Sequence, residues 1–454
     1  MPYLLNVVYL ALLIVASPWL IYASVRKKKY RTGFAEKFLG LVPRREGAEP
    51  CVWIHAVSVG EVALIASLVK QLRTQRPGWR IVISTTTHTG LETARKKYPE
   101  LTSFYCPLDF SWAVRAAMRR LRPSLLVLAE LELWPNLVRA ANESRVPVAV
   151  VNGRLGERSF RGYSKIRRLM SRLLGRLAVV GVQNEEYRRR FLELGCDAAK
   201  LTTTGSLKFD GAASDRRNPH TLKLAELAGV RVGQGVRTGH GVSDDVVFLA
   251  GSTQEGEEAA ALEAYRAALA DHPRLRLIVV PRHPDRFDEV AELCRRSGFR
   301  FRRRTELGSP QNAPTEDTAA NTDAWQVLLV DAIGELGAWW GLAQIAFVGG
   351  SFGDRGGQNM LEPAAYGAAV SFGPNTWNFR DIAGALVAAG GAEVVADSAA
   401  LTAFVRRALA EPVYAATLGD RARALVAANR GATLRTVALL LPLVDEAAEV
   451  RRAA

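Results

Sequence analysis

The chain has 454 residues, a length that allows two large domains or three small ones. Hydrophobic residues make up 48% and charged residues 23%, which is typical of a folded protein and excludes a wholly disordered or collagen-like chain. The net charge of +15 favours an anionic partner, such as a phosphorylated ligand, an acidic membrane surface or a nucleic acid. The four cysteines lie far apart without paired histidines, which argues against a disulfide framework and a zinc site.

The N-terminal segment, residues 4–25, contains no charged side chain and is long enough to cross a bilayer as a helix. Basic residues follow it directly and none precedes it: Arg26, Lys27, Lys28, Lys29 and Arg31. A secretory signal peptide has the opposite order, and the positive-inside rule places the rest of the chain in the cytoplasm. We therefore expect a membrane anchor here, with a buried core helix and a cleaved signal peptide as alternatives.

After this segment, short β-branched runs alternate with helical patterns, as in a parallel sheet covered on both faces. The alternation stops at residues 211–245 and then restarts, and residues 303–324 are predicted to form a polar surface loop. The expected strands are 52–55, 80–84, 125–129, 148–152 and 178–183 in the first half, and 246–250, 276–280, 326–330, 344–348 and 369–372 in the second.

This pattern predicts an α/β fold of two doubly wound, Rossmann-like domains in series. The expected parts are an anchor with its basic flank over 1–30, a first domain over 31–210, a linker over 211–245 and a second domain over 246–454. Ligands of such sheets bind beyond the carboxyl ends of the strands, so two facing sheets would form a cleft between the domains.

A second basic stretch, residues 154–190, interleaves arginines with leucines. This pattern predicts an amphipathic helix that lies on anionic lipid, or a solvated helix face packed on its own sheet. Charge alone permits nucleic-acid binding, but the sequence carries no helix-turn-helix, zinc-finger or RNP-type motif. We therefore expect no nucleic-acid partner.

Three sites in the first half place chemically useful side chains after a strand. Glu61 follows the first strand at a helix start, where it is either a general base or a favourable first-turn carboxylate. Glu130 and Glu132 follow the buried strand 125–129, and strand alternation would put them on the same side. Lys208 precedes the linker and would either meet an anionic leaving group or be a surface lysine.

In the second half, Pro281 and Arg282 follow a strand, and Arg282 has the shape of an anion ligand. Residues 347–363 run from a strand through a glycine-rich loop to a helix expected to start near Asn359. Bare backbone N–H groups there would bind phosphate without a metal, and Glu362 could accept hydrogen bonds from ribose hydroxyls. The lack of a suitable Asp-x-Asp pair favours a metal-independent reaction.

Seven motifs appear in the order and spacing of one family: residues 55–61, 130–136, 183–186, 204–210, 281–284, 347–351 and 359–362. Almost from end to end, the chain resembles the 3-deoxy-D-manno-octulosonic acid (Kdo) transferases of Gram-negative bacteria. The resemblance implies a GT-B glycosyltransferase with two facing Rossmann-like domains. It further implies transfer of Kdo from CMP-Kdo to a lipid A precursor, lipid IVA, at the cytoplasmic face of the inner membrane.

The resemblance also implies a role for each site residue. Glu61 would be the proton acceptor, and Glu130 and Lys208 would stabilise the transition state. The residues that would hold CMP are Pro281, Arg282, Ile333, Gly334, Glu335, Asn359, Met360, Leu361 and Glu362. No cofactor or metal is expected beyond the donor substrate.

Two other function classes compete with this interpretation. One is another GT-B enzyme, either a UDP-sugar glycosyltransferase or a nucleotide-sugar epimerase, and the other is a membrane-anchored binding protein without catalysis. Retention of Glu61, Glu130 and Lys208 favours the transferase. The sequence does not indicate an oligomeric state.

Overall fold

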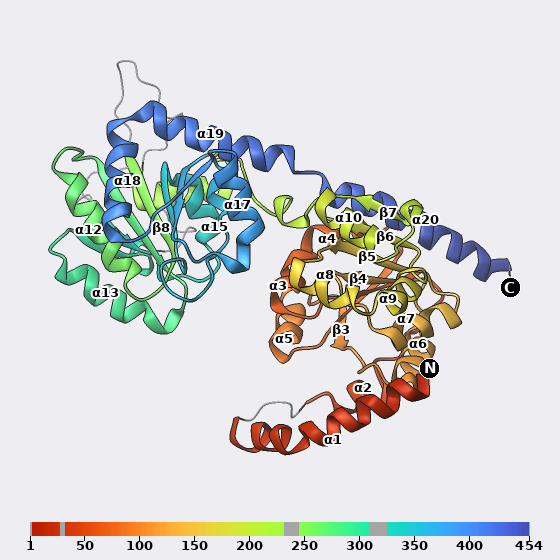
Figure 1. The fold of residues 1–454 in the computed structure, drawn as a ribbon. Coiled ribbons are helices and arrows are strands. Elements are labelled where there is room, and N and C mark those ends of the chain that lie inside the picture. The colour runs from red at the N-terminus through yellow and green to blue at the C-terminus, as the bar shows by residue number, and fades with distance from the viewer. Residues whose placement is uncertain (1, 28–31, 231–244, 309–324, 454) are drawn as a thin grey trace. The chain divides into compact units, whose positions relative to one another are not determined.

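The computed structural model describes residues 2–27, 32–230, 245–308 and 325–453, which form two compact units. Met1–Gly211 and Asn429–Ala454 make up the first unit, and Ala212–Ala428 make up the second. Figure 1 shows the chain returning to the first unit through the blue C-terminal helix. The domain boundaries thus differ from those expected, because residues 429–454 pack on the first sheet and residues 212–230 belong to the second unit. Residues 231–244 of the expected linker and 309–324 of the expected loop lie outside the described residues.

The first unit is built on a seven-stranded parallel sheet of order β3-β2-β1-β4-β5-β6-β7. Its strands are β1 (Cys51–His55), β2 (Arg80–Thr85), β3 (Thr102–Tyr105), β4 (Leu125–Ala129), β5 (Val148–Gly153), β6 (Val179–Val182) and β7 (Leu201–Thr203). Its helices are α1 (Pro2–Lys27), α2 (Phe34–Leu39), α3 (Val59–Leu64), α4 (Ala66–Gln75), α5 (His88–Lys97), α6 (Ser111–Leu121), α7 (Pro135–Glu143), α8 (Glu157–Ser164), α9 (Arg167–Leu174), α10 (Glu185–Glu193) and α20 (Ala432–Ala453), with 3-10 turns η1 (Ala198–Lys200) and η2 (Leu207–Phe209). The strand order reverses between β1 and β4, which is where doubly wound sheets bind ligands.

The second unit repeats this plan with the order β10-β11-β9-β8-β12-β13-β14. Its strands are β8 (Val246–Thr253), β9 (Leu275–Pro281), β10 (Phe301–Arg303), β11 (Val327–Leu329), β12 (Ile345–Val348), β13 (Ala369–Phe372) and β14 (Ala392–Val394). Its α-helices are α11 (Pro219–Ala228), α12 (Glu257–Leu269), α13 (Phe287–Arg296), α15 (Leu336–Trp339), α16 (Leu361–Ala365), α17 (Arg380–Ala388), α18 (Ser398–Ala410) and α19 (Pro412–Ala428). Its 3-10 turns are η3 (Pro284–Arg286), η4 (Arg304–Leu307), η5 (Trp340–Leu342) and η6 (Trp377–Phe379). The order reverses here between β8 and β12.

Alternating side chains of the first sheet enter two separate cores. Trp53 packs on one face, whereas Val52 and Ile54 pack on the other with Leu440 of α20. All of these side chains are fully buried. The strands are therefore apolar on both faces, as the unbroken apolar runs of the sequence predicted.

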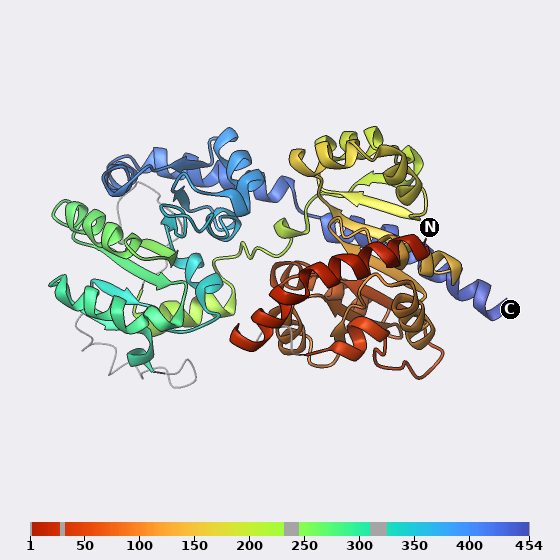
Figure 2. The ribbon, with the colours of Figure 1, turned by 60° about the horizontal axis from the view of Figure 1, so that its bottom comes forward.

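The helix α1 lies against the first unit and is held there by buried polar groups (Figures 1 and 2). Asn6 donates to Ser111 Oγ at 2.8 Å and accepts from the Ser111 N–H at 3.0 Å. The Tyr9 hydroxyl donates to Asp109 at 3.0 Å, and the same carboxylate accepts from the Leu137 N–H at 2.8 Å. The start of α1 is thus part of the hydrogen-bonded structure of this unit.

Among the described residues, one apolar stretch is long enough to cross a membrane, Pro412–Glu446. It is broken into α19 and α20, and Leu440 and Val444 lie in the core of the first unit. A shorter apolar stretch, Leu5–Trp19, lies within α1.

Candidate active site

Glu61 lies in the first turn of α3, directly beyond the carboxyl end of β1. Ser58 caps this helix, and its hydroxyl donates to Glu61 Oε1 at 3.1 Å. The Val57 N–H donates to Glu61 Oε2 at 2.8 Å. These two hydrogen bonds hold the carboxylate in one orientation.

The surroundings of Glu61 raise its pKa to about 7. Burial is the largest cause, the Val57 N–H opposes it, and the negative charges of Glu130 and Glu132 raise the pKa further. A carboxylate with a pKa near the working pH accepts protons far better than an ordinary glutamate. The geometry therefore fits the predicted general base as well as a helix cap.

Glu130 follows β4, the neighbour of β1 at the point where the strand order reverses. Its backbone has a φ of 57°, a left-handed conformation that is uncommon for glutamate. The strand ends at Ala129, so the alternation that we invoked to align Glu130 with Glu132 does not extend to them. The two carboxylates are nevertheless close enough to interact, since burial and the Glu130 charge raise the pKa of Glu132.

Lys208 lies half-buried in η2, beyond the last strand of the first sheet. The Leu207 N–H donates to Asn152 Oδ1 at 3.0 Å, which joins this turn to the carboxyl end of β5. Asp210 accepts from the Gly431 and Thr433 N–H groups at 2.7 and 2.5 Å. The motif containing Lys208 thus also anchors the returning C-terminal segment, a structural role that the sequence did not suggest.

The predicted CMP-binding residues all follow strands at the carboxyl edge of the second sheet. Pro281 ends β9, and the exposed Arg282 donates its N–H to the Thr253 carbonyl at 3.0 Å. Beyond β11, the Ile333 side chain is 76% exposed, and Gly334 has a φ of 89° that favours glycine. The Glu335 carboxylate accepts two hydrogen bonds from Arg304, at 2.8 and 2.9 Å, so its oxygens already have protein partners.

The segment Asn359–Glu362 leads into the helix that was expected to start near Asn359. The five-residue helix α16 starts at Leu361, and the Met360 and Leu361 side chains are fully buried in the core. These two residues can therefore contact a ligand only through their backbones. The Asn359 amide donates to Glu362 Oε1 at 3.0 Å, and burial raises the pKa of the Glu362 carboxyl.

The glycine-rich loop differs from the expected phosphate cradle, because a carboxylate of this chain already binds its N–H groups. Glu257, at the start of α12, accepts from the N–H groups of Gly350, Ser351 and Phe352 at 2.7, 2.9 and 3.0 Å, and from Gln254 at 2.8 Å. Its side chain is buried, and a Cβ at Gly349 would lie 2.6 Å from its Oε2. These three N–H groups are therefore not bare, which corrects our prediction.

Sequence reasoning assigned no role to Glu257. The position of Glu257 could have indicated its role, because Glu257 lies in the first turn of the helix that follows the first strand of its sheet, as Glu61 does. The buried N–H donors that pair with Glu257 come from a loop about 93 residues away, which no local pattern reveals.

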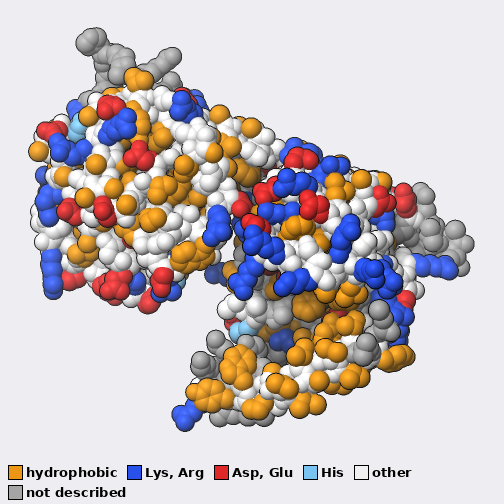
Figure 3. All heavy atoms as spheres, viewed as in Figure 1, with side chains coloured by type: hydrophobic (Ala, Val, Ile, Leu, Met, Phe, Trp, Pro, Cys, Tyr) orange, Lys and Arg blue, Asp and Glu red, His pale blue; other side chains and the backbone are white. Residues whose placement is uncertain are grey.

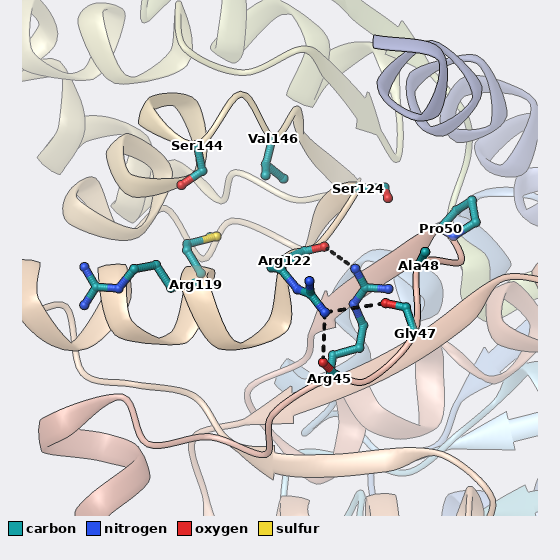
Figure 4. Close-up of a pocket in the computed structure, with 10 residues that line it drawn as sticks. Arg45, Gly47, Ala48, Pro50, Arg119, Arg122, Ser124, Ser144 and Val146 are labelled. Carbon is teal, nitrogen blue, oxygen red and sulfur yellow. Dashed lines mark hydrogen bonds between the residues drawn. The ribbon is translucent and has the colours of Figure 1, made fainter. Parts of the chain in front are cut away.

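A cavity of about 800 Å³ lies in the first unit, away from the predicted site residues (Figure 4). The cavity is lined by residues that come just before three strands: Pro50 before β1, Ser124 before β4 and Val146 before β5. It therefore opens at the amino edge of the sheet. Arg45 and Arg122 donate to backbone carbonyl groups there. These arginines therefore hold loops together at the edge opposite Glu61.

No group of three or more His, Cys, Asp or Glu side chains within the described ranges could hold a metal ion. The four cysteines, Cys51, Cys106, Cys196 and Cys294, are buried free thiols. The predicted site residues thus consist of carboxylates, cations and backbone groups.

Comparisons with known proteins identify the family. A family model described as 3-deoxy-D-manno-octulosonic-acid transferase (kdotransferase) matches residues 29–211. The 3-deoxy-D-manno-octulosonic acid transferase of Haemophilus influenzae is 33% identical over 96% of this chain and 98% of its own. The enzyme of the same name from Bordetella pertussis is 35% identical over 85% of this chain and 86% of its own.

The fold is also similar to that of a UDP-GlcNAc 2-epimerase from Neisseria meningitidis, with a TM-score of 0.56 at 12% identity over 86% of this chain and all of that one. At this identity the likeness concerns the fold alone, two Rossmann-like units of GT-B type. The relatives that match nearly the whole chain decide its family. The chain belongs to the 3-deoxy-D-manno-octulosonic acid transferases and is a glycosyltransferase that transfers Kdo.

Proposed function

We propose that the donor is CMP-Kdo, that the acceptor is the lipid A precursor lipid IVA, and that the anomeric centre is inverted without a metal ion. The observation that carries the proposal is Glu61, a carboxylate held by Val57 and Ser58 with its pKa raised to about 7. A group that is half deprotonated near neutral pH is suited to accept the proton of an acceptor hydroxyl.

In the proposed reaction, Glu61 takes the hydroxyl proton as the acceptor oxygen attacks the anomeric carbon of Kdo. A bond forms between that oxygen and the anomeric carbon, and the bond from this carbon to the phosphate oxygen breaks. CMP leaves from the opposite face, which inverts the configuration. Glu130 and Lys208 stabilise the charges that develop in the transition state, as the family resemblance implies.

We infer that CMP binds at the carboxyl edge of the second sheet, along Pro281, Arg282, Ile333–Glu335 and Asn359–Glu362. The exposed Arg282 guanidinium is suited to the phosphate, and Glu362 is suited to the ribose hydroxyls. Met360, Leu361 and Glu335 would contribute through their backbones, since their side chains are buried or already paired. Because Glu257 fills the loop of residues 350–352, the phosphate is expected outside that loop.

The protein is proposed to associate with the cytoplasmic face of the inner membrane, where an acylated acceptor lies. Two features of the first unit support this: the apolar face of α1 and the basic helices α8 and α9. The expected single amphipathic helix is divided in two, with Met170, Leu173 and Leu174 buried. The exposed basic residues are Arg158, Arg161, Lys165, Arg167, Arg168, Arg172 and Arg176. Such a surface attracts anionic headgroups.

The test is CMP release by the full chain with CMP-Kdo and detergent-dispersed lipid IVA, without added metal and with a chelator present. The proposal predicts release that depends on both substrates and continues in the chelator. Release of UDP from a UDP-sugar, with no CMP released from CMP-Kdo, would contradict the donor assignment. Loss of CMP release in the chelator would contradict metal independence.

A further inference from the structure

The first observation concerns the two ends of α1. The helix has 26 residues and is about 39 Å long at 1.5 Å per residue. Near its start, Asn6 and Tyr9 bind Ser111 and Asp109 in the segment that leads into α6. Beyond its end, the Thr32 hydroxyl lies 2.9 Å from the hydroxyl of Tyr105, the last residue of β3. Both ends are therefore attached to the same compact unit.

The contacts near the start of α1 are built into that unit. Asn6 is 6% exposed and Asp109 is 5% exposed. Asp109 also accepts from the N–H groups of Asn136 and Leu137, which begin α7. Pulling α1 away would remove the hydrogen bonds that Asn6 and Tyr9 make with Ser111 and Asp109, and buried polar groups that lose a partner destabilise the folded state.

The buried and exposed residues of α1 define two opposite faces. Asn6, Tyr9 and Leu13 follow the helical spacing of 3 and 4 and are buried or half-buried, so this stripe faces the unit. Large apolar side chains on the rest of the helix are exposed: Tyr3, Val7, Val8, Leu10, Leu12, Ile14, Val15, Trp19 and Tyr22. Figure 3 shows hydrophobic side chains gathered along this helix.

A transmembrane helix must place its two ends on opposite sides of the bilayer. The two ends of α1 are bound to one folded unit, which cannot lie on both sides. We therefore propose that α1 does not cross the membrane but lies flat in the interface of an anionic bilayer, with its apolar face in the acyl region. This proposal rests on the proposed membrane association and replaces the spanning anchor that the sequence predicted.

Lipid is the occupant that fits this face best. Residues 4–25 carry no charged side chain, and basic residues follow them directly, so an apolar face ends beside cations that attract anionic headgroups. Phe34, Leu39 and Trp112 of the same unit are also exposed and extend the apolar surface beyond α1. A helix of this kind buries its apolar face about 5–10 Å into the headgroup and acyl boundary.

Spin labels along one stripe of α1 distinguish a flat helix from a crossing one. Val8→Cys, Val15→Cys and Tyr22→Cys lie seven residues apart at positions that are 44%, 79% and 55% exposed. The full-length variants are labelled with a nitroxide in phosphatidylethanolamine–phosphatidylglycerol vesicles, and immersion depth is measured by oxygen and nickel accessibility. Lys70→Cys, at an exposed position on α4 of the first unit, is the water-exposed control.

A flat helix predicts the same depth, within a few ångströms, at all three positions. A crossing helix puts successive labels about 10 Å apart along the bilayer normal, so label 15 would lie about 10 Å deeper than labels 8 and 22. That gradient would overturn the proposal. Absence of lipid exposure at all three positions would also overturn it and would indicate that protein covers the face.

A second measurement uses a membrane-impermeant maleimide on the Tyr3→Cys variant, since the four native thiols are buried. The proposal predicts no labelling from the outer side of spheroplasts and labelling in inverted vesicles, whereas a crossing helix predicts the reverse. CMP release with detergent-dispersed lipid IVA tests the transferase proposal separately, so the two can fail independently.

Discussion

Glu61 and Glu257 hold corresponding positions in the two units, in the first turn of the helix after the first strand of each sheet. Glu257 accepts four backbone N–H groups, three of them from the loop after β12. Glu61 accepts one backbone N–H and the Ser58 hydroxyl, and the loop after β4 offers it the carboxylates of Glu130 and Glu132 instead. The same position thus holds a structural anion in one unit and the proposed proton acceptor in the other.

The first prediction concerns pH. Because burial and neighbouring carboxylates raise the pKa of Glu61 to about 7, kcat/KM should rise about tenfold per pH unit below pH 7 and level off above it. The rise follows from deprotonation of the base. A profile governed by an ordinary glutamate would already be flat at pH 6, and that result would contradict the assignment.

The same pKa shift affects stability with the opposite sign. The folded state holds the Glu61 proton above pH 4.5, where the unfolded state has lost it. The contribution of Glu61 to the free energy of unfolding therefore falls as pH rises from about 4.5 to about 7. Activity and this contribution change in opposite directions over that window.

The second prediction concerns the Glu257→Gln variant. In this variant an NH₂ group replaces one carboxylate oxygen and cannot accept hydrogen bonds from the backbone N–H groups. Each buried N–H group left unpaired lowers the free energy of unfolding by about 1–3 kcal/mol. We expect a lower thermal midpoint and weaker CMP binding. The matched control is the exposed Glu255→Gln, which should change neither. Wild-type stability in Glu257→Gln would show that the loop does not depend on this carboxylate.

At the scale of elements, the sequence predicted the ten inner strands but none of the four outer ones. β3, β7, β10 and β14 are the edge strands of the two sheets and have only three or four residues. Inner strands are buried on both faces and read as apolar runs, whereas edge strands include exposed residues such as Thr102 and Val394. Their pairing depends on the sheet beside them, which short local patterns do not encode.

The sequence pattern did not predict where α20 packs, because its return to the first unit depends on contacts between residues far apart in the chain.

The third prediction tests the packing of α20 on the first unit. Leu440 is fully buried, so Leu440→Ala should lower the free energy of unfolding of the first unit by about 2–5 kcal/mol. Leu434→Ala, at a position that is 55% exposed on the same helix, should change it by less than about 0.5 kcal/mol. Equal urea midpoints for the two variants would contradict the packing of α20.

At the scale of the whole molecule, two compact units each have their own sheet and core. The sequence predicted the fold class and the strands that carry the site, because carboxyl ends of parallel strands meet at one edge. It did not predict that the Glu257 carboxylate binds the glycine-rich loop, because the partners Gly350–Phe352 are distant in the chain.

The fourth prediction concerns the second unit as a separate fragment. A fragment of residues 212–428 should fold cooperatively and bind CMP, because its core is internal and the proposed CMP-binding residues all lie within it. Calorimetry should show weaker CMP binding for Glu362→Ala in the fragment, while Glu226→Ala on the exposed face of α11 leaves it unchanged. A folded fragment without CMP affinity would remove the nucleotide site from this unit.

The central claim is that Glu61 is the base for transfer of Kdo from CMP-Kdo, and one comparison tests it most directly. CMP release with lipid IVA is measured for the wild type, for Glu61→Gln and for Glu92→Gln, an exposed glutamate of α5 as the control. Loss of a general base predicts that Glu61→Gln lowers kcat by about 10²-fold or more at pH 8, with CMP-Kdo affinity retained and the control unaffected. A Glu61→Gln variant that folds, binds CMP-Kdo and turns over at the wild-type rate would contradict the account.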